Sequence, residues 1–128
     1  MTDNDTLSRK QAAMQFLQLV VTGRIKEAYQ KYVDLQGKHH NPTFPAGFRA
    51  LEKAMIENHV QFPSKQITVK NLLGDGKLVA VHSHIILRPG EPGAAAVHLF
   101  RFHGGKIVEM WDCGQPLPVD SPNKDGAF

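Results

Sequence analysis

Hydrophobic residues recur at helical spacing through the first half of the chain. The first stripe predicts a helix that starts at Asp5 or Thr6, either of which can cap its free N–H groups, and that ends near Gly23. Two further stripes predict helices over about residues 25–34 and 45–58. The first half therefore predicts three helices with short connections.

The second half changes to the alternation of apolar and polar residues that is typical of β-strands. Four such runs, separated by turns rich in glycine and proline, predict strands over about residues 66–73, 77–87, 95–103 and 106–113. Short turns between successive strands favour an antiparallel meander. Three helices followed by this meander predict one α+β domain over the whole chain, with residues 114–128 as a proline-containing tail.

Composition narrows the class of protein without naming a function. The 128 residues contain one cysteine, which excludes an intrachain disulfide and a four-cysteine zinc site. The net charge of +3 comes from scattered lysines and arginines, so no nucleic-acid partner is expected. No apolar run is long enough to span a bilayer, and the polar N-terminus has no secretory character, so we expect a cytoplasmic protein without a membrane partner.

The unusual feature of the composition is the presence of seven histidines, several of which fall on the predicted strands. Alternation gives one strand face to His82 and His84, one to His98, Phe100 and Phe102, and one to Val108, Met110 and Asp112. If the sheet curves around a core, these faces would form an apolar pocket with a few polar groups, as small-molecule sites do. A strand histidine also often points to solvent or satisfies a buried hydrogen bond, and Asp112 could equally be a surface carboxylate.

Two other kinds of chemistry have weak support in the sequence. His39, His40, His82, His84 and Asp112 show no recognised metal-ligand spacing, so no metal is expected. Nothing near Cys113 indicates an activated nucleophile.

Trp111 and Glu109 alternate with Asp112 and so occupy the opposite face of their strand. A large aromatic residue on that face needs cover, for which a second copy of the chain is the natural candidate. The alternative is partial cover by the proline-containing tail. We therefore expect a homodimer formed through the sheet face that bears Trp111.

Two stretches resemble a known family: Tyr32–Pro42, which reads YVDLQGKHHNP, and Val97–Pro116, which reads VHLFRFHGGKIVEMWDCGQP. They are similar to motifs of the SnoaL-like proteins of the NTF2-like superfamily, whose namesakes are polyketide cyclases that catalyse an intramolecular aldol condensation. The likeness spans about residues 7–118. It implies a cone in which three N-terminal helices pack on a curved, mainly antiparallel sheet.

The resemblance also implies roles for particular residues. Asp112 matches a carboxylate that tends to point into the family's cavity, His40 matches the histidine of a His-Asn-Pro segment at its rim or wall, and Arg101 matches a motif arginine. Two positions depart from the pattern, because His98 replaces a frequent Asp and Met110 a frequent His. The polar set of the cavity is therefore rearranged in this chain.

Together with these residues, the resemblance implies an enzyme without metal or organic cofactor: a lyase, isomerase, dehydratase or cyclase that enolises a small apolar carbonyl compound. Asp112 would be the base and His84 or His98 the proton donor. His40 would be a second polar group, and the expected substrate contacts are Tyr32, His82, Phe100, Phe102 and Met110. The alternative is a non-catalytic module that binds a small ligand or mediates dimeric interactions.

Overall fold

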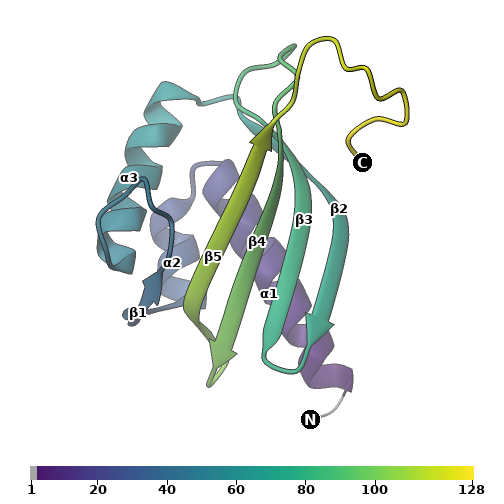
Figure 1. The fold of residues 1–128 in the computed structure, drawn as a ribbon. Helices are drawn as coiled ribbons and strands as arrows, with labels where there is room; N and C mark the ends of the chain where they lie inside the picture. The colour runs from purple at the N-terminus through teal and green to yellow at the C-terminus, as the bar shows by residue number, and fades with distance from the viewer. Residues whose placement is uncertain (1–2) are drawn as a thin grey trace.

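Three helices and a five-stranded sheet make up the computed structural model, which describes residues 3–128 (Figure 1). The helices are α1 (Asp3–Val21), α2 (Ile25–Tyr32) and α3 (Phe48–Gln61). The strands are β1 (Val33–His39), β2 (Gln66–Asp75), β3 (Leu78–Ile86), β4 (Ala94–His103) and β5 (Lys106–Pro116). No helix among the described residues is long and apolar enough to cross a membrane.

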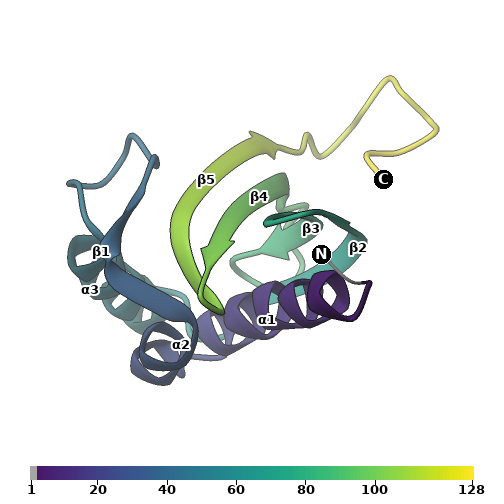
Figure 2. The ribbon, with the colours of Figure 1, turned by 90° about the horizontal axis from the view of Figure 1, so that it is seen from below.

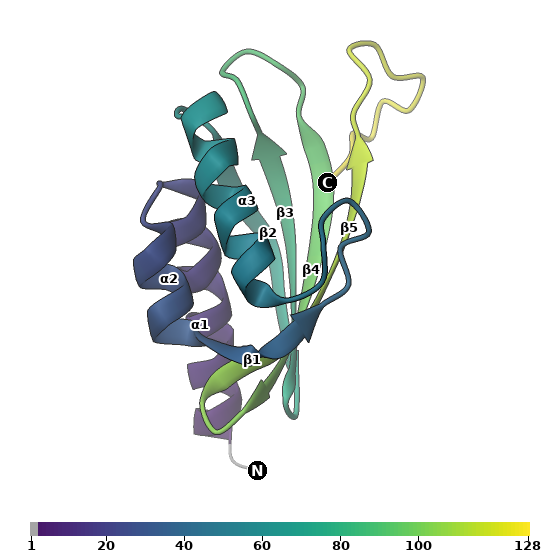
Figure 3. The same cartoon turned by 90° about the vertical axis from the view of Figure 1, so that its left-hand side faces the viewer.

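The sheet is curved, and its strands run in the order β1-β5-β4-β3-β2 (Figure 2). β2 to β5 form the expected antiparallel meander, while β1 adds to β5 in parallel. All three helices cover one face of the sheet, and the C-terminal tail leaves on the side away from them (Figure 3). We call these the inner and the outer face. The α+β class and the curved sheet are thus as predicted.

The core lies between the helices and the inner face of the sheet. On α1 the buried residues Ala13, Phe16, Leu17 and Val20 follow helical spacing. The Phe16 ring meets those of Tyr29 on α2 and Phe100 on β4 edge-on, at centroid distances of 5.2 and 5.8 Å. Burying large side chains of this kind contributes about 1.5–3 kcal/mol each, so these contacts fix the helical layer on the sheet.

Register determines which strand residues face this core. β3 turns Val79, Val81 and Ser83 inward, and β4 turns Ala96, His98, Phe100 and Phe102 inward. A bulge between Arg101 and Phe102 shifts the pairing with β5, so that Ile107 lies opposite Phe102 and is buried. Simple alternation gives Ile107 to the outer face, and that expectation is wrong because of this bulge.

The main departure from the sequence-based expectation is β1, which occupies part of the segment expected to be helix and loop. Its strand signal is short, because only Val33 and Leu35 alternate with polar residues before Gly37. The helices also differ at their ends: α1 already includes Asp3, and α3 spans Phe48–Gln61 rather than 45–58. β5 continues through Pro116, so the tail begins later than expected.

Gly37 is required where β1 crosses β5. A Cβ at this position would lie 2.3 Å from the Val108 carbonyl oxygen and 2.9 Å from the Phe48 ring. We expect Gly37→Ala to lower the free energy of unfolding by about 1–3 kcal/mol, because backbone atoms must move apart. Gly114→Ala is the matched control, since its nearest atom would be 3.9 Å away. Urea denaturation measures both, and equal stabilities of the two variants would contradict this account.

Candidate functional site

The centre of the candidate site is a pair of residues on the inner face of β4 and β5. His98 and Asp112 are direct partners across the two antiparallel strands. Residues paired in this way have Cβ atoms about 5 Å apart. Phe100 and Met110 form the next inward-facing pair, and the rings of His98 and Phe100 are stacked with centroids 6.1 Å apart. The fold therefore brings Asp112, His98, Phe100 and Met110 together on the inner face.

Asn41 orients the carboxylate of Asp112. Its Nδ2 donates a hydrogen bond to Asp112 Oδ2 at 3.0 Å, and its Oδ1 accepts one from the backbone N–H of Thr43 at 2.9 Å. Because both ends of the amide are engaged, its orientation is defined and it presents a donor to Asp112. The loop after β1 is thereby bound to the middle of β5.

His39 is buried and holds this loop in place. The backbone N–H of Asn41 donates to His39 Nδ1 at 3.1 Å, while His39 Nε2 lies 2.8 Å from the carbonyl oxygen of Pro45. Since Nδ1 accepts, Nε2 must carry the proton that is donated to Pro45. His39 is thus a neutral structural histidine that positions Asn41.

The pKa of His98 differs from that of a histidine in water. Burial lowers the pKa of His98, and the negative charge of Asp112 opposes that shift. Its Nδ1 is enclosed and has no hydrogen-bond partner among residues 3–128. The imidazole is therefore neutral, with one ring N–H that can donate to a developing oxyanion.

Tyr29, on α2, contributes a polar tip from the helical layer. Burial raises the pKa of its hydroxyl, and the charges of Glu52 and Asp112 raise it further. The hydroxyl therefore stays protonated and can only act as a neutral hydrogen-bond donor or acceptor. Neither Tyr29 nor Asn41 was predicted from the sequence as a site residue, because their places in the fold depend on how the helices and the loop pack.

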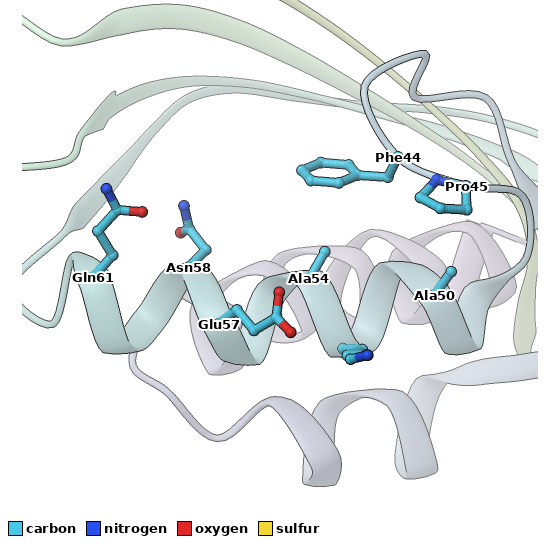
Figure 4. A pocket seen from close by; sticks show the side chains of 8 residues that line it. Phe44, Pro45, Ala50, Ala54, Glu57, Asn58 and Gln61 are labelled. Carbon is cyan, nitrogen blue, oxygen red and sulfur yellow. The ribbon is translucent and has the colours of Figure 1, made fainter.

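A groove of about 500 Å³ runs along α3 beside this loop (Figure 4). It is lined by Phe44, Pro45, Ala50, Lys53, Ala54, Glu57, Asn58 and Gln61. The backbone N–H of Phe44 donates to the carbonyl oxygen of Asn41 at 3.4 Å. One end of the groove is therefore formed by the same loop that holds Asp112.

The structure places His82 and His84 on the outer face, away from His98. The residue of β3 that pairs with His98 is Val81, whereas His82 pairs with the outward-facing Val97. The rings of His82 and His84 lie 5.4 and 4.9 Å from that of Phe128 in the tail. The prediction that they line the same site as His98 is wrong, because the register differs by one residue from the one it needs.

His40 and Tyr32 are also outside the candidate site. His40 Nε2 lies 2.6 Å from Glu109 Oε2, and its ring stacks on Trp111 at 5.1 Å, so it belongs to the outer face. The hydroxyl of Tyr32 donates to the side-chain carbonyl of Gln15 on α1. Of the two adjacent histidines, the inner one is His39, and the family likeness pointed to the wrong member of the pair.

Glu109 lies at the centre of a charged cluster on the outer face. Arg101 donates to its Oε1 from Nε at 3.0 Å and from Nη2 at 2.6 Å. The hydrogen bond from His40 and those from Arg101 lower the pKa of Glu109. This cluster joins the end of β1 to β4 and β5, so Arg101 has a structural partner and is not aimed at the site.

The remaining predicted residues lie in the core or at the surface. Phe100, Phe102 and Met110 are buried in the core. Cys113 is exposed. Within residues 3–128, no group of three or more His, Cys, Asp or Glu side chains could hold a metal ion.

A model of the SnoaL-like domain family matches residues 13–110, and the chain therefore belongs to this family. The match includes α1 from Ala13 onward, α2, α3, the strands β1 to β4, and β5 as far as Met110. A search of curated proteins gave no matching relative.

Solved structures with the same fold include proteins of several described kinds. The chain is similar to AclR, a putative hydroxylase from Streptomyces galilaeus (TM-score 0.71, 18% identity, covering 86% of this chain and 90% of that one). It is also similar to an NTF-2 like protein of unknown function from Burkholderia xenovorans (0.70, 20%, 90% and 88%). A putative polyketide cyclase from Acidithiobacillus ferrooxidans is a third (0.66, 21%, 84% and 87%). At these identities the likeness shows the NTF2-like fold.

The electrostatics of His98 predict a pH dependence of stability. Because its folded-state pKa lies below that of an ordinary histidine, the unfolded chain binds the proton first. The free energy of unfolding should therefore fall as the pH drops below about 6.5. His98→Gln should flatten this fall, whereas His82→Gln on the outer face should keep it. Urea titrations from pH 8 to pH 5 measure the slopes, and an unchanged slope in His98→Gln would refute the assignment.

Proposed function

We propose that this protein is a cofactor-free lyase, isomerase or cyclase that enolises a small apolar carbonyl compound. The observation that carries the proposal is the arrangement of Asp112, an inward-facing carboxylate bound by the Asn41 amide and opposite a neutral His98. Membership of the SnoaL-like family supports it, as does the likeness in fold to a putative polyketide cyclase.

In the proposed reaction Asp112 removes a proton from the carbon next to the substrate carbonyl. The Asn41 bond occupies Oδ2 and leaves Oδ1 to take the proton. The electron pair of the broken C–H bond moves to the carbonyl oxygen, where the His98 ring N–H and the Tyr29 hydroxyl are the available donors. Both are neutral, so they stabilise the oxyanion by hydrogen bonds.

Two outcomes follow from the same enolate. In an isomerisation, protonated Asp112 returns the proton to a different carbon. In an aldol-type cyclisation, the enolate carbon attacks a second carbonyl of the substrate, a C–C bond forms, and the new alkoxide takes the proton back from Asp112. The apolar side chains of Phe100 and Met110 beside the pair favour an apolar substrate.

Exchange of carbon-bound hydrogen tests the first step without knowledge of the natural substrate. We expect the protein to accelerate deuterium incorporation next to the carbonyl of some members of a panel of aryl ketones and 1,3-diketones in D₂O, followed by NMR. Asp112→Asn should reduce the catalysed rate by about 10²–10⁴-fold, the usual contribution of a general base.

Glu109→Gln is the matched control, because it removes a carboxylate from the outer face of the same strand and should leave exchange unchanged. Retention of exchange by folded Asp112→Asn would refute the role of Asp112. Ligands that bind without any exchange would instead support a non-catalytic binding module.

We also propose that the protein is a homodimer formed through the outer face of β4 and β5. Leu99 and Trp111 are paired there, and Val97 and Leu99 remain 37% and 38% exposed. The C-terminal Phe128 lies instead over His82 and His84 of β3, so the tail and a second copy would cover different parts of the face.

Light scattering checks the dimer. The wild-type protein should have about twice the 14.2 kDa mass of one chain, whereas Leu99→Glu should be monomeric because a charge would be buried between the copies. Leu73→Glu, which alters an exposed leucine on β2, should remain dimeric. A wild-type mass of one chain at all concentrations would contradict the proposal.

A further inference from the structure

Lys65, between α3 and β2, is a buried cation with no carboxylate partner among residues 3–128. Its side chain is one of three buried polar or charged ones in the described chain, and the residue is only 8% exposed. Its Nζ donates to Asn58 Oδ1 at 2.5 Å. Among residues 3–128, no carboxylate lies within 4.0 Å of this ammonium group. Burial without an ionic partner is costly for an ammonium group, and it lowers the pKa of Lys65.

The partner of Lys65 belongs to the wall of the groove along α3. Asn58 lines that groove, and its side chain projects from α3 on the same side as the Phe44 ring (Figure 4). Because Asn58 Oδ1 is engaged by Lys65, its Nδ2 is left to donate into the groove. The ammonium group of Lys65 is therefore connected to the groove through the side chain of Asn58. Asn58 lies at the end of the groove opposite Pro45 and Ala50 (Figure 4).

The rest of the groove suits a ligand with an apolar body. Phe44, Ala50 and Ala54 supply apolar surface, and the volume of about 500 Å³ is that of a small-molecule site. Lys53 and Glu57 also line it, both with exposed side chains. Because the charges of Lys53 and Glu57 are solvated, a bound anion would stabilise the buried charge of Lys65 more than that of Lys53.

We propose that this groove binds a carboxylate-bearing ligand, whose anionic end accepts a hydrogen bond from Asn58 Nδ2 and is stabilised by the nearby charge of Lys65 behind Asn58, and whose apolar body packs on Phe44 and Ala54. The proposal deepens the proposed function and rests on it in one respect: the substrate class becomes carbonyl compounds that carry a carboxylate. The acid would lie at the Asn58 end, and the carbonyl would point past Phe44 toward Asp112.

A matched pair of ligands tests the groove, with binding measured by isothermal titration calorimetry. 4-Phenylbutyrate carries the carboxylate, and 4-phenylbutyramide is its neutral counterpart. We expect the wild-type protein to bind the acid at least about tenfold more tightly than the amide, because hydrogen bonds to charged groups are the stronger ones. Lys65→Met should lose this preference, whereas Lys77→Met, which removes an exposed lysine outside the groove, should keep it.

Asn58→Asp is a second variant that does not depend on how Lys65→Met folds. It places a carboxylate beside Lys65, so the free energy of unfolding should rise while the preference for 4-phenylbutyrate disappears. A wild-type protein without preference for the acid, or an unchanged preference in Lys65→Met or Asn58→Asp, would overturn the proposal.

Asp112→Asn separates this proposal from the enzymatic one. It should bind 4-phenylbutyrate as the wild-type protein does, because Asp112 is not part of the carboxylate site. Loss of exchange chemistry with intact acid binding leaves the groove proposal in place. Catalysed exchange on neutral ketones together with no preference for the acid would remove the groove proposal alone.

Discussion

The pairing of β4 with β5 is the constraint on which the rest of the structure depends. It places His98 opposite Asp112 and Phe100 opposite Met110, and it sends Leu99 and Trp111 to the other side. A shift of β5 by one residue would turn its other face to the core. Glu109 would then face the core without Arg101 beside it, and Asp112 would be in solvent. The apolar stripe of α1, which packs on Phe100, selects the observed register because it can only be buried by the face that carries Phe100.

The alternation of side chains along β4 and β5 also gives the two faces of the sheet different electrostatic environments. On the inner side burial lowers the pKa of His98 and raises that of the Tyr29 hydroxyl, so both groups are neutral, and the Asp112 carboxylate lies opposite His98. On the outer side Glu109 has a lowered pKa, first through its hydrogen bond from His40 and then through those from Arg101. The adjacent residues His39 and His40 lie on opposite sides of the sheet for the same reason. One is buried and orients a loop, and the other stacks on Trp111 in the outer cluster.

The sequence predicted the α+β class and the meander, and it placed Met110 and Asp112 on one strand face, because alternation along a strand needs only local information. It did not predict the histidines of β3 correctly. His82 and His84 alternate as neatly as their neighbours, but only the register of β3 on β4 shows that Val81, not His82, accompanies His98. Asn41 and Tyr29 were missed for a related reason. Asn41 reaches Asp112 from the end of a parallel strand with a weak signal, and the place of Tyr29 depends on helix packing. Neither feature has a local sequence pattern.

The loop after β1 explains how two distant sites can serve one ligand. Asn41 binds Asp112 through its side chain and Phe44 through its backbone carbonyl, so the carboxylate and the apolar wall of the groove are connected by a single hydrogen-bonded turn. His39 anchors that turn to Pro45, next to the start of α3, and α3 in turn presents Asn58 to Lys65. A ligand that fills the groove would therefore contact elements whose positions are already fixed relative to Asp112. Such pre-organisation lowers the entropic cost of binding, and it makes the distance between the anion site and the base a property of the fold rather than of the ligand.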